Sequence, residues 1–126
     1  MKKLLALLIL VVSLGACDDS AGPDDADYYV LESIAGDAVP AVTDDGDATI
    51  HASTITLFDD GDAEFTLSYQ LAGASRTNIE LFGDWTATST SEVVIDLEGG
   101  DQLIATRSGN LLLIDEVNGT WRYELR

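Results

Sequence analysis

The chain has 126 residues, of which 23 are Asp or Glu, six are Lys or Arg, one is His and one is Cys. This length fits one domain rather than two. The formal net charge of −17 would repel phosphate backbones, which argues against a nucleic-acid partner. A single cysteine excludes an internal disulfide and a zinc site built on cysteines.

The first 16 residues have the pattern of a signal peptide. Two lysines precede residues 4–14, which are all apolar except for one serine. This run is too short to span a hydrocarbon core as a helix, which needs about 20 residues. The small residues Gly15 and Ala16 follow, as in a cleavage site. Removal of residues 1–16 would leave four Arg, no Lys and 23 acidic residues, a net charge of −19.

The sequence Leu14-Gly15-Ala16-Cys17 resembles the lipoprotein box of bacteria. The resemblance implies cleavage between Ala16 and Cys17, lipid attachment to the Cys17 thiol, and acylation of the new amino group by a fatty acid such as palmitate. Two or more acyl chains hold a protein stably on a bilayer. We therefore expect a lipid anchor in the bacterial cell envelope, on either the inner or the outer membrane. The alternative is an ordinary signal peptide followed by an incidental cysteine.

An acidic segment follows the expected anchor. Residues 18–27 contain five Asp, one Gly, one Pro and no large apolar side chain. Such a segment cannot bury enough surface to offset the entropy lost on ordering. We predict that residues 17–27 form a lipidated Cys17 and a disordered tether, and that the folded domain covers residues 28–126.

From Tyr28 onward, apolar residues recur with a period of two. In residues 63–71 the odd-numbered positions are apolar and most even-numbered ones are polar, the pattern of a half-buried strand. An Asp-Gly turn at residues 59–62 separates this strand from the one before it, as in a hairpin. Gly83 marks a bend or bulge. Strands are expected at residues 28–34, 48–52, 53–58, 63–71, 81–89, 92–97, 102–107, 111–115 and 120–126.

These strands, about eight in number, are joined mostly by short loops, which force antiparallel neighbours. A meander of eight strands can close on itself and so remove its exposed edges. The interior of such a barrel holds side chains or one small ligand. We predict an all-β fold, an antiparallel barrel whose last strand pairs with its first. A β-sandwich is the second choice.

Four segments carry a resemblance to a known family. They are YVLESIAGDAVP near the start, ITLFDDGDAEFTLSY, GDWTATSTSEVVIDL, and GTWRYELR at the C-terminus. This order of turns and aromatic residues resembles the small lipocalin-like domains of bacterial lipoproteins. The resemblance covers residues 28–126 and implies a lipocalin-like β-barrel.

The candidate site residues are large side chains on the expected inward faces. They either fill the core or line a ligand cavity. They are Phe65, Leu67, Tyr69, Trp85, Trp121 and Tyr123. His51 has no second His or Cys to complete a metal site, so we expect no metal, cofactor or catalytic role. The two DDGD sequences, at residues 44–47 and 59–62, are expected to be solvated turns.

Together these observations predict an envelope lipoprotein without enzymatic activity. Its expected role is to bind a small apolar or amphipathic molecule inside the barrel. The alternative is a protein-interaction or inhibitor module whose filled barrel contacts another envelope protein. In both cases the membrane is a partner through Cys17, and nucleic acid is not.

The anchor is tested by the substitution Cys17→Ser. We expect the variant to leave the membrane fraction or to accumulate as an unprocessed precursor, because the acylated thiol is lost. Fractionation and mass spectrometry of the processed chain measure both outcomes. If the variant is still acylated and cut at the same bond, the lipoprotein interpretation is wrong.

Overall fold

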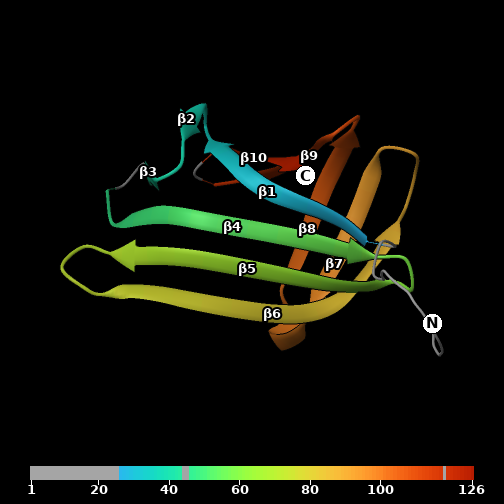
Figure 1. Ribbon diagram of the computed structural model, residues 1–126, viewed down its shortest axis with the longest axis horizontal. Helices are drawn as coiled ribbons and strands as arrows, with labels where there is room; N and C mark the ends of the chain where they lie inside the picture. Colours follow the sequence, from blue (N-terminus) through green and yellow to red (C-terminus); the bar gives the residue numbers. More distant parts are fainter. Residues whose placement is uncertain (1–25, 44–45, 118) are drawn as a thin grey trace, which may run out of the picture.

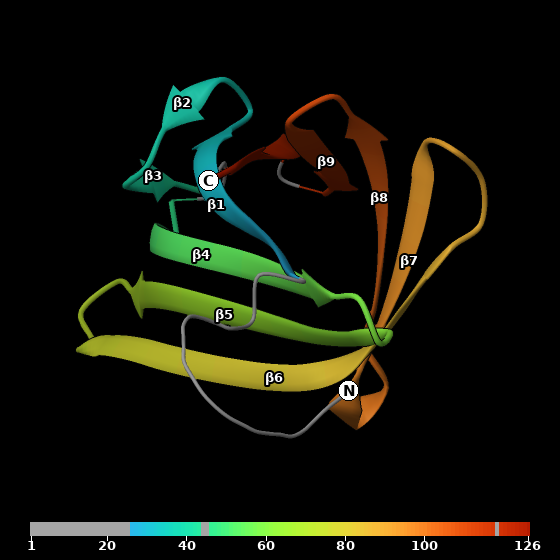
Figure 2. The same cartoon turned by 45° about the vertical axis from the view of Figure 1, so that its right-hand side comes forward.

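The computed structural model describes residues 26–43, 46–117 and 119–126. The predicted signal peptide, Cys17 and the tether up to residue 25 lie outside the described residues, as do the first two Asp of the DDGD sequence at 44–47. The described chain forms one antiparallel sheet that closes into an eight-stranded barrel (Figures 1 and 2). The predicted barrel is therefore confirmed, and the sandwich is excluded.

The barrel is a meander in which most strands pair with their neighbours in sequence. Its strands are β1 (Ala26–Ile34), β4 (Ala48–Phe58), β5 (Asp62–Leu71), β6 (Arg76–Ala87), β7 (Glu92–Leu97), β8 (Gln102–Ser108), β9 (Leu111–Glu116) and β10 (Gly119–Leu125). Two short strands, β2 (Asp37–Ala38) and β3 (Ala41–Val42), pair with β1 and β4. A 3-10 turn, Glu98–Gly100, connects β7 to β8.

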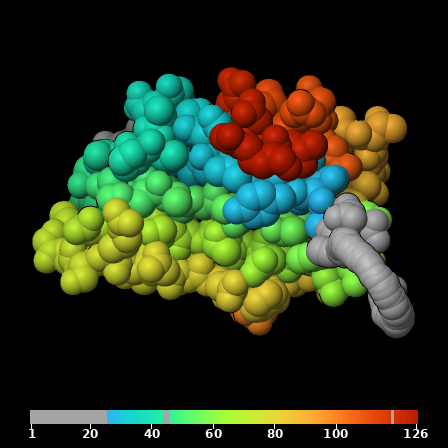
Figure 3. All heavy atoms as spheres, in the orientation of Figure 1, coloured from blue at the N-terminus to red at the C-terminus, as the bar shows by residue number. Residues whose placement is uncertain are grey.

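Strand β1 closes the barrel by pairing on both of its edges. Its first residues pair with β4, where Ala26 lies opposite Phe58. Its later residues pair with β10, where Leu31 lies opposite Tyr123. Figure 3 shows β1 side chains packed between those of β4 and those of the C-terminal strand. The predicted pairing of the last strand with the first is confirmed.

Three boundaries differ from the sequence prediction by more than a shift of one or two residues at a strand end, or change which part of the chain is assigned to the barrel. Residues 48–52 and 53–58 form one strand, β4, whose register shifts between Ile50 and Ala52. The expected strand at 81–89 begins earlier, at Arg76, because residues 76–80 pair along β5. Strand β1 begins at Ala26, so the last two residues assigned to the tether belong to the barrel.

Gly83 allows β6 to change partners. It pairs with Ala63 of β5 on one side and with Leu97 of β7 on the other. A Cβ atom at this position would collide with the carbonyl oxygen of Asp96 and lie 2.8 Å from the Cα of Leu97. Only glycine lets the two backbones approach this closely. Figure 2 shows β6 running along β5 before its last residues meet β7.

The core fills most of the barrel and draws on every barrel strand except β6 for its fully buried side chains. Burial of one Leu or Ile side chain stabilises a fold by about 1.5–3 kcal/mol. The largest buried side chains are Tyr29, Ile55, Leu57, Ile95, Leu112 and Tyr123. The alternation predicted for residues 63–71 stops short of Leu71, which is 51% exposed at the end of β5.

The substitution Gly83→Ala tests the close approach of β6 and β7. We expect a loss of roughly 3 kcal/mol in the free energy of unfolding, because the added methyl meets backbone atoms that cannot move aside. Thr86→Ala, at an exposed position of the same strand, is the control and should change stability by no more than ~0.5 kcal/mol. Urea unfolding measures both. Equal effects would contradict the role assigned to Gly83.

Candidate ligand pocket

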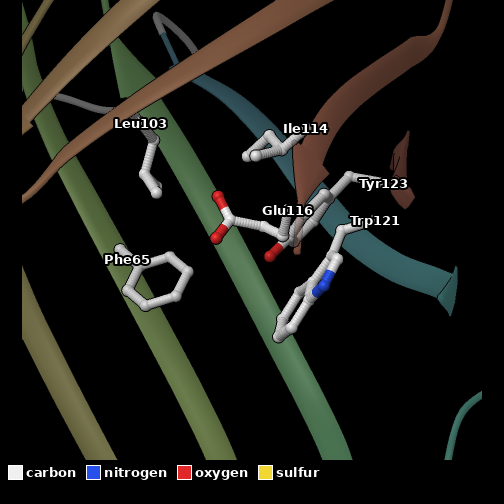
Figure 4. Close-up of a pocket in the computed structure, with 6 residues that line it drawn as sticks. All are labelled: Phe65, Leu103, Ile114, Glu116, Trp121 and Tyr123. Atoms are coloured by element: carbon white, nitrogen blue, oxygen red, sulfur yellow. The ribbon is translucent and has the colours of Figure 1, made fainter. Parts of the chain in front are cut away.

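An apolar pocket of about 100 Å³ lies inside one end of the barrel (Figure 4). Its walls come from four strands, β5, β8, β9 and β10. The lining residues are Phe65, Leu103, Ile114, Glu116, Trp121 and Tyr123. The pocket extends from Tyr123, near the middle of the barrel, towards the turn that joins β9 to β10.

The strand register explains why these side chains meet. Ile114 of β9 lies opposite Trp121 of β10, and both face inward. The same alternation brings Glu116, the last residue of β9, to the inward side at the end of the barrel. Figure 4 shows its carboxylate directed into the space between Phe65, Leu103 and Trp121. The pocket therefore has apolar walls and one acidic group at its mouth.

A buried hydrogen-bond chain forms the floor of the pocket. The Ser53 hydroxyl donates to the carbonyl oxygen of Thr66 over 2.7 Å. The Tyr123 hydroxyl lies 2.9 Å from Ser53 Oγ. Since a serine hydroxyl has one proton, Tyr123 must be the donor in this second bond. The chain joins β10 to β4 and β5 across the barrel interior and fixes the Tyr123 ring.

Burial raises the pKa of Tyr123 above the ordinary range of tyrosine. The hydrogen bond with Ser53 acts in the opposite direction, and the negative charge of Glu116 raises the pKa further. The phenol is therefore protonated at all physiological pH values and remains a hydrogen-bond donor.

Three of the six predicted site residues line this pocket: Phe65, Trp121 and Tyr123. Leu67 and Tyr69 pack against the core but do not line it. Trp85 lies towards the opposite end of the barrel, where its indole N–H donates to the carbonyl oxygen of Phe58 over 2.7 Å.

Sequence reasoning missed the other three lining residues, Leu103, Ile114 and Glu116. Leu103 and Ile114 lie in predicted strands, but nothing in the pattern distinguishes a cavity wall from a filled core. Glu116 lies just beyond the strand that was predicted at residues 111–115, in the turn expected before the next strand. The signal that could have placed it is the alternation Leu112, Ile114, Glu116, which continues one step beyond the last apolar residue.

The end of the barrel that holds Trp85 contains an inward-facing cation. The guanidinium carbon of Arg107 lies 5.5 Å from the centroid of the Trp85 ring, a cation–π contact. Two of its nitrogens, Nε and Nη2, are buried without a hydrogen-bond partner among the described residues. Burial raises the pKa of the neighbouring Tyr29, and the positive charge of Arg107 opposes that shift. The indole ring of Trp85 thus contacts the Arg107 cation, which forms no ion pair with the described residues.

The side chain of His51 is held by hydrogen bonds to two neighbouring side chains. Arg76 Nη2 lies 3.0 Å from His51 Nδ1, and Gln70 Oε1 lies 3.1 Å from His51 Nε2. Because guanidinium can only donate, Nδ1 is the acceptor and the Nε2–H donates to Gln70. Both ring nitrogens are therefore engaged on the barrel surface. The described residues contain no group of three or more His, Cys, Asp or Glu side chains that could hold a metal ion.

No family model, curated protein or solved structure matches this chain. The lipocalin-like resemblance therefore stays a prediction. Within the described residues, no helix is long and apolar enough to cross a membrane.

The substitution Tyr123→Phe tests the buried hydrogen-bond chain. At neutral pH we expect a cost of about 1 kcal/mol, because Ser53 loses its donor but keeps its bond to Thr66. Above about pH 10 the unfolded chain ionises its tyrosines, while the folded chain keeps Tyr123 protonated. Stability should therefore fall as the pH rises through this range.

Tyr123→Phe should make that alkaline decline shallower without abolishing it, since Tyr29 also has a raised pKa. Urea unfolding at a series of alkaline pH values provides the measurement. A decline as steep as that of the unsubstituted protein would contradict the burial of an ionisable Tyr123.

Proposed function

We propose that the protein is a lipid-anchored lipoprotein of the bacterial cell envelope, and that its lipocalin-like barrel binds a small apolar or amphipathic molecule without transforming it. The observation that carries the binding role is the apolar pocket of about 100 Å³ inside one end of the barrel. The anchor rests on the lipoprotein box at Cys17.

The size of the pocket restricts its ligand. An apolar cavity of about 150 Å³ accommodates a benzene ring. A pocket of about 100 Å³ takes a short alkyl group or part of a ring, so the rest of the molecule must extend past Glu116 at the mouth. This geometry favours an amphipathic ligand over one that is apolar throughout.

The expected affinity is modest. Burial of about four carbon atoms at ~0.8 kcal/mol each gives roughly 3 kcal/mol, which corresponds to a dissociation constant on the order of several millimolar. Such a protein would sample a ligand that is abundant near the membrane rather than retain a rare one.

A second candidate function is a protein-interaction or inhibitor module. It is favoured by large apolar side chains on the outer face, since Tyr28 is 45% and Phe82 is 52% exposed. The strand register places both in one row across β1, β4, β5 and β6, with Thr56 and Glu64 between them. Exposed aromatic residues are common where proteins meet.

Native mass spectrometry of the mature lipoprotein, released from lipid nanodiscs, distinguishes the two. We expect a small molecule that accompanies the protein and is lost in Leu103→Trp, because the larger side chain fills the pocket. Ile104→Trp places the same side chain on the outer face of β8, where Ile104 is 54% exposed, and should retain the molecule. A protein free of small molecules, with a second envelope protein bound instead, would support the interaction module.

A further inference from the structure

The pocket lining contains aromatic and acidic side chains but no basic ones. Three of its six residues are aromatic, one is a carboxylate, and none is Lys, Arg or His. The face of an aromatic ring carries partial negative charge. A ligand in this pocket therefore meets negative potential both from the rings and from Glu116.

The charge of Glu116 is not neutralised by its surroundings. Its carboxylate makes no hydrogen bond or ion pair with any residue that the structure describes. The described ion pairs are those of Arg126, with Glu32 and Glu124. The inward-facing cation, Arg107, stacks on Trp85 towards the other end of the barrel. Glu116 is thus available to a charged ligand.

The positions of the aromatic rings and the carboxylate favour one orientation of a bound ligand. Figure 4 shows the Glu116 carboxylate between Phe65 on one side and Trp121 and Tyr123 on the other. A positive group placed beside the carboxylate would contact the aromatic rings, and its apolar substituent would extend towards Ile114 and Leu103. Aromatic rings with a nearby acid are a recurrent solution for binding ammonium groups.

We propose that the ligand of this pocket is a small organic cation, an amine or quaternary ammonium compound with an apolar substituent. This inference rests on the proposed binding function and specifies the charge of its ligand. The negative charge of the whole chain, −17, raises the local concentration of such a cation and disfavours an anionic ligand such as a fatty-acid carboxylate.

Three probes of similar shape and different charge provide the test: benzylammonium, benzyl alcohol and benzoate. Binding is followed by tryptophan fluorescence of the mature lipoprotein in phosphatidylcholine vesicles, since the chain has two Trp and one of them, Trp121, lines the pocket. We expect benzylammonium to bind about tenfold more tightly than benzyl alcohol, a difference of ~1.4 kcal/mol. Benzoate should bind more weakly than either.

Two variants distinguish the effect of the Glu116 carboxylate from the effect of the overall negative charge of the protein. Glu116→Gln keeps the shape of the side chain and should reduce the affinity for benzylammonium to that for benzyl alcohol. Glu124→Gln removes the same charge from an outward position of β10 and should leave the preference unchanged. Phe65→Leu should weaken binding of the cation more than that of the alcohol, because it removes one aromatic face.

The outcomes are distinguishable. If benzyl alcohol binds as tightly as benzylammonium, or if Glu116→Gln keeps the preference, the cation inference is overturned while the binding function stands. If none of the three probes changes the fluorescence, the inference and the proposed binding function both fail.

Discussion

The closed barrel depends on strand β1, because this strand joins the two edges of the meander. Its first half completes the ladder of β4 and its second half that of β10. Without this double pairing, the inward faces of eight strands would form an open sheet with two exposed edges. Closure fixes the width of the interior at a value that side chains nearly fill. The inward-facing residues therefore decide, by their sizes alone, where space remains.

Part of that space lies at the β9–β10 end of the barrel. Tyr123 and Ser53 occupy the middle of the barrel through a buried hydrogen bond, and Arg107, Trp85 and Tyr29 pack together beyond them. On the other side of Tyr123, the β9–β10 end is lined by aromatic and aliphatic side chains that leave a pocket. A phenol at mid-barrel can serve as a floor because burial keeps it protonated and Ser53 accepts its proton.

The period of two was sufficient to predict the strands whose outer face is polar, such as β5 and β10, and the pairing of β10 with β1. It was insufficient where the backbone departs from regular alternation. The register shift beside His51 made one strand, β4, look like two. In residues 76–80 only Ile79 is apolar, so the first half of β6 had too weak a pattern to be recognised.

The pocket itself could not be predicted for a different reason. Phe65, Trp121 and Tyr123 were identified as candidates from their size, but whether they meet or leave a gap depends on which strands face one another across the barrel. Trp85 has a similar sequence signature and yet packs against Arg107 at the opposite end. The lipid anchor is a separate matter, since Cys17 lies outside the described residues and its role remains a prediction.

The charged side chains on the inward side of the barrel differ in sign between its two ends. On the outer face, the side chain of Glu80 raises the pKa of Glu64 through hydrogen bonding, and partial burial and the negative charge of Glu80 add to this shift. On the inward side of the sheet, the cation Arg107 lies near the start of β9, and the exposed carboxylate of Glu116 lies at the end of β9, at the pocket mouth. Arg107 and Glu116 lie towards opposite ends of the barrel and form no ion pair with each other. An amphipathic ligand would therefore enter with its apolar part towards Tyr123 and keep a positive group at the mouth, where the carboxylate and solvent both stabilise it.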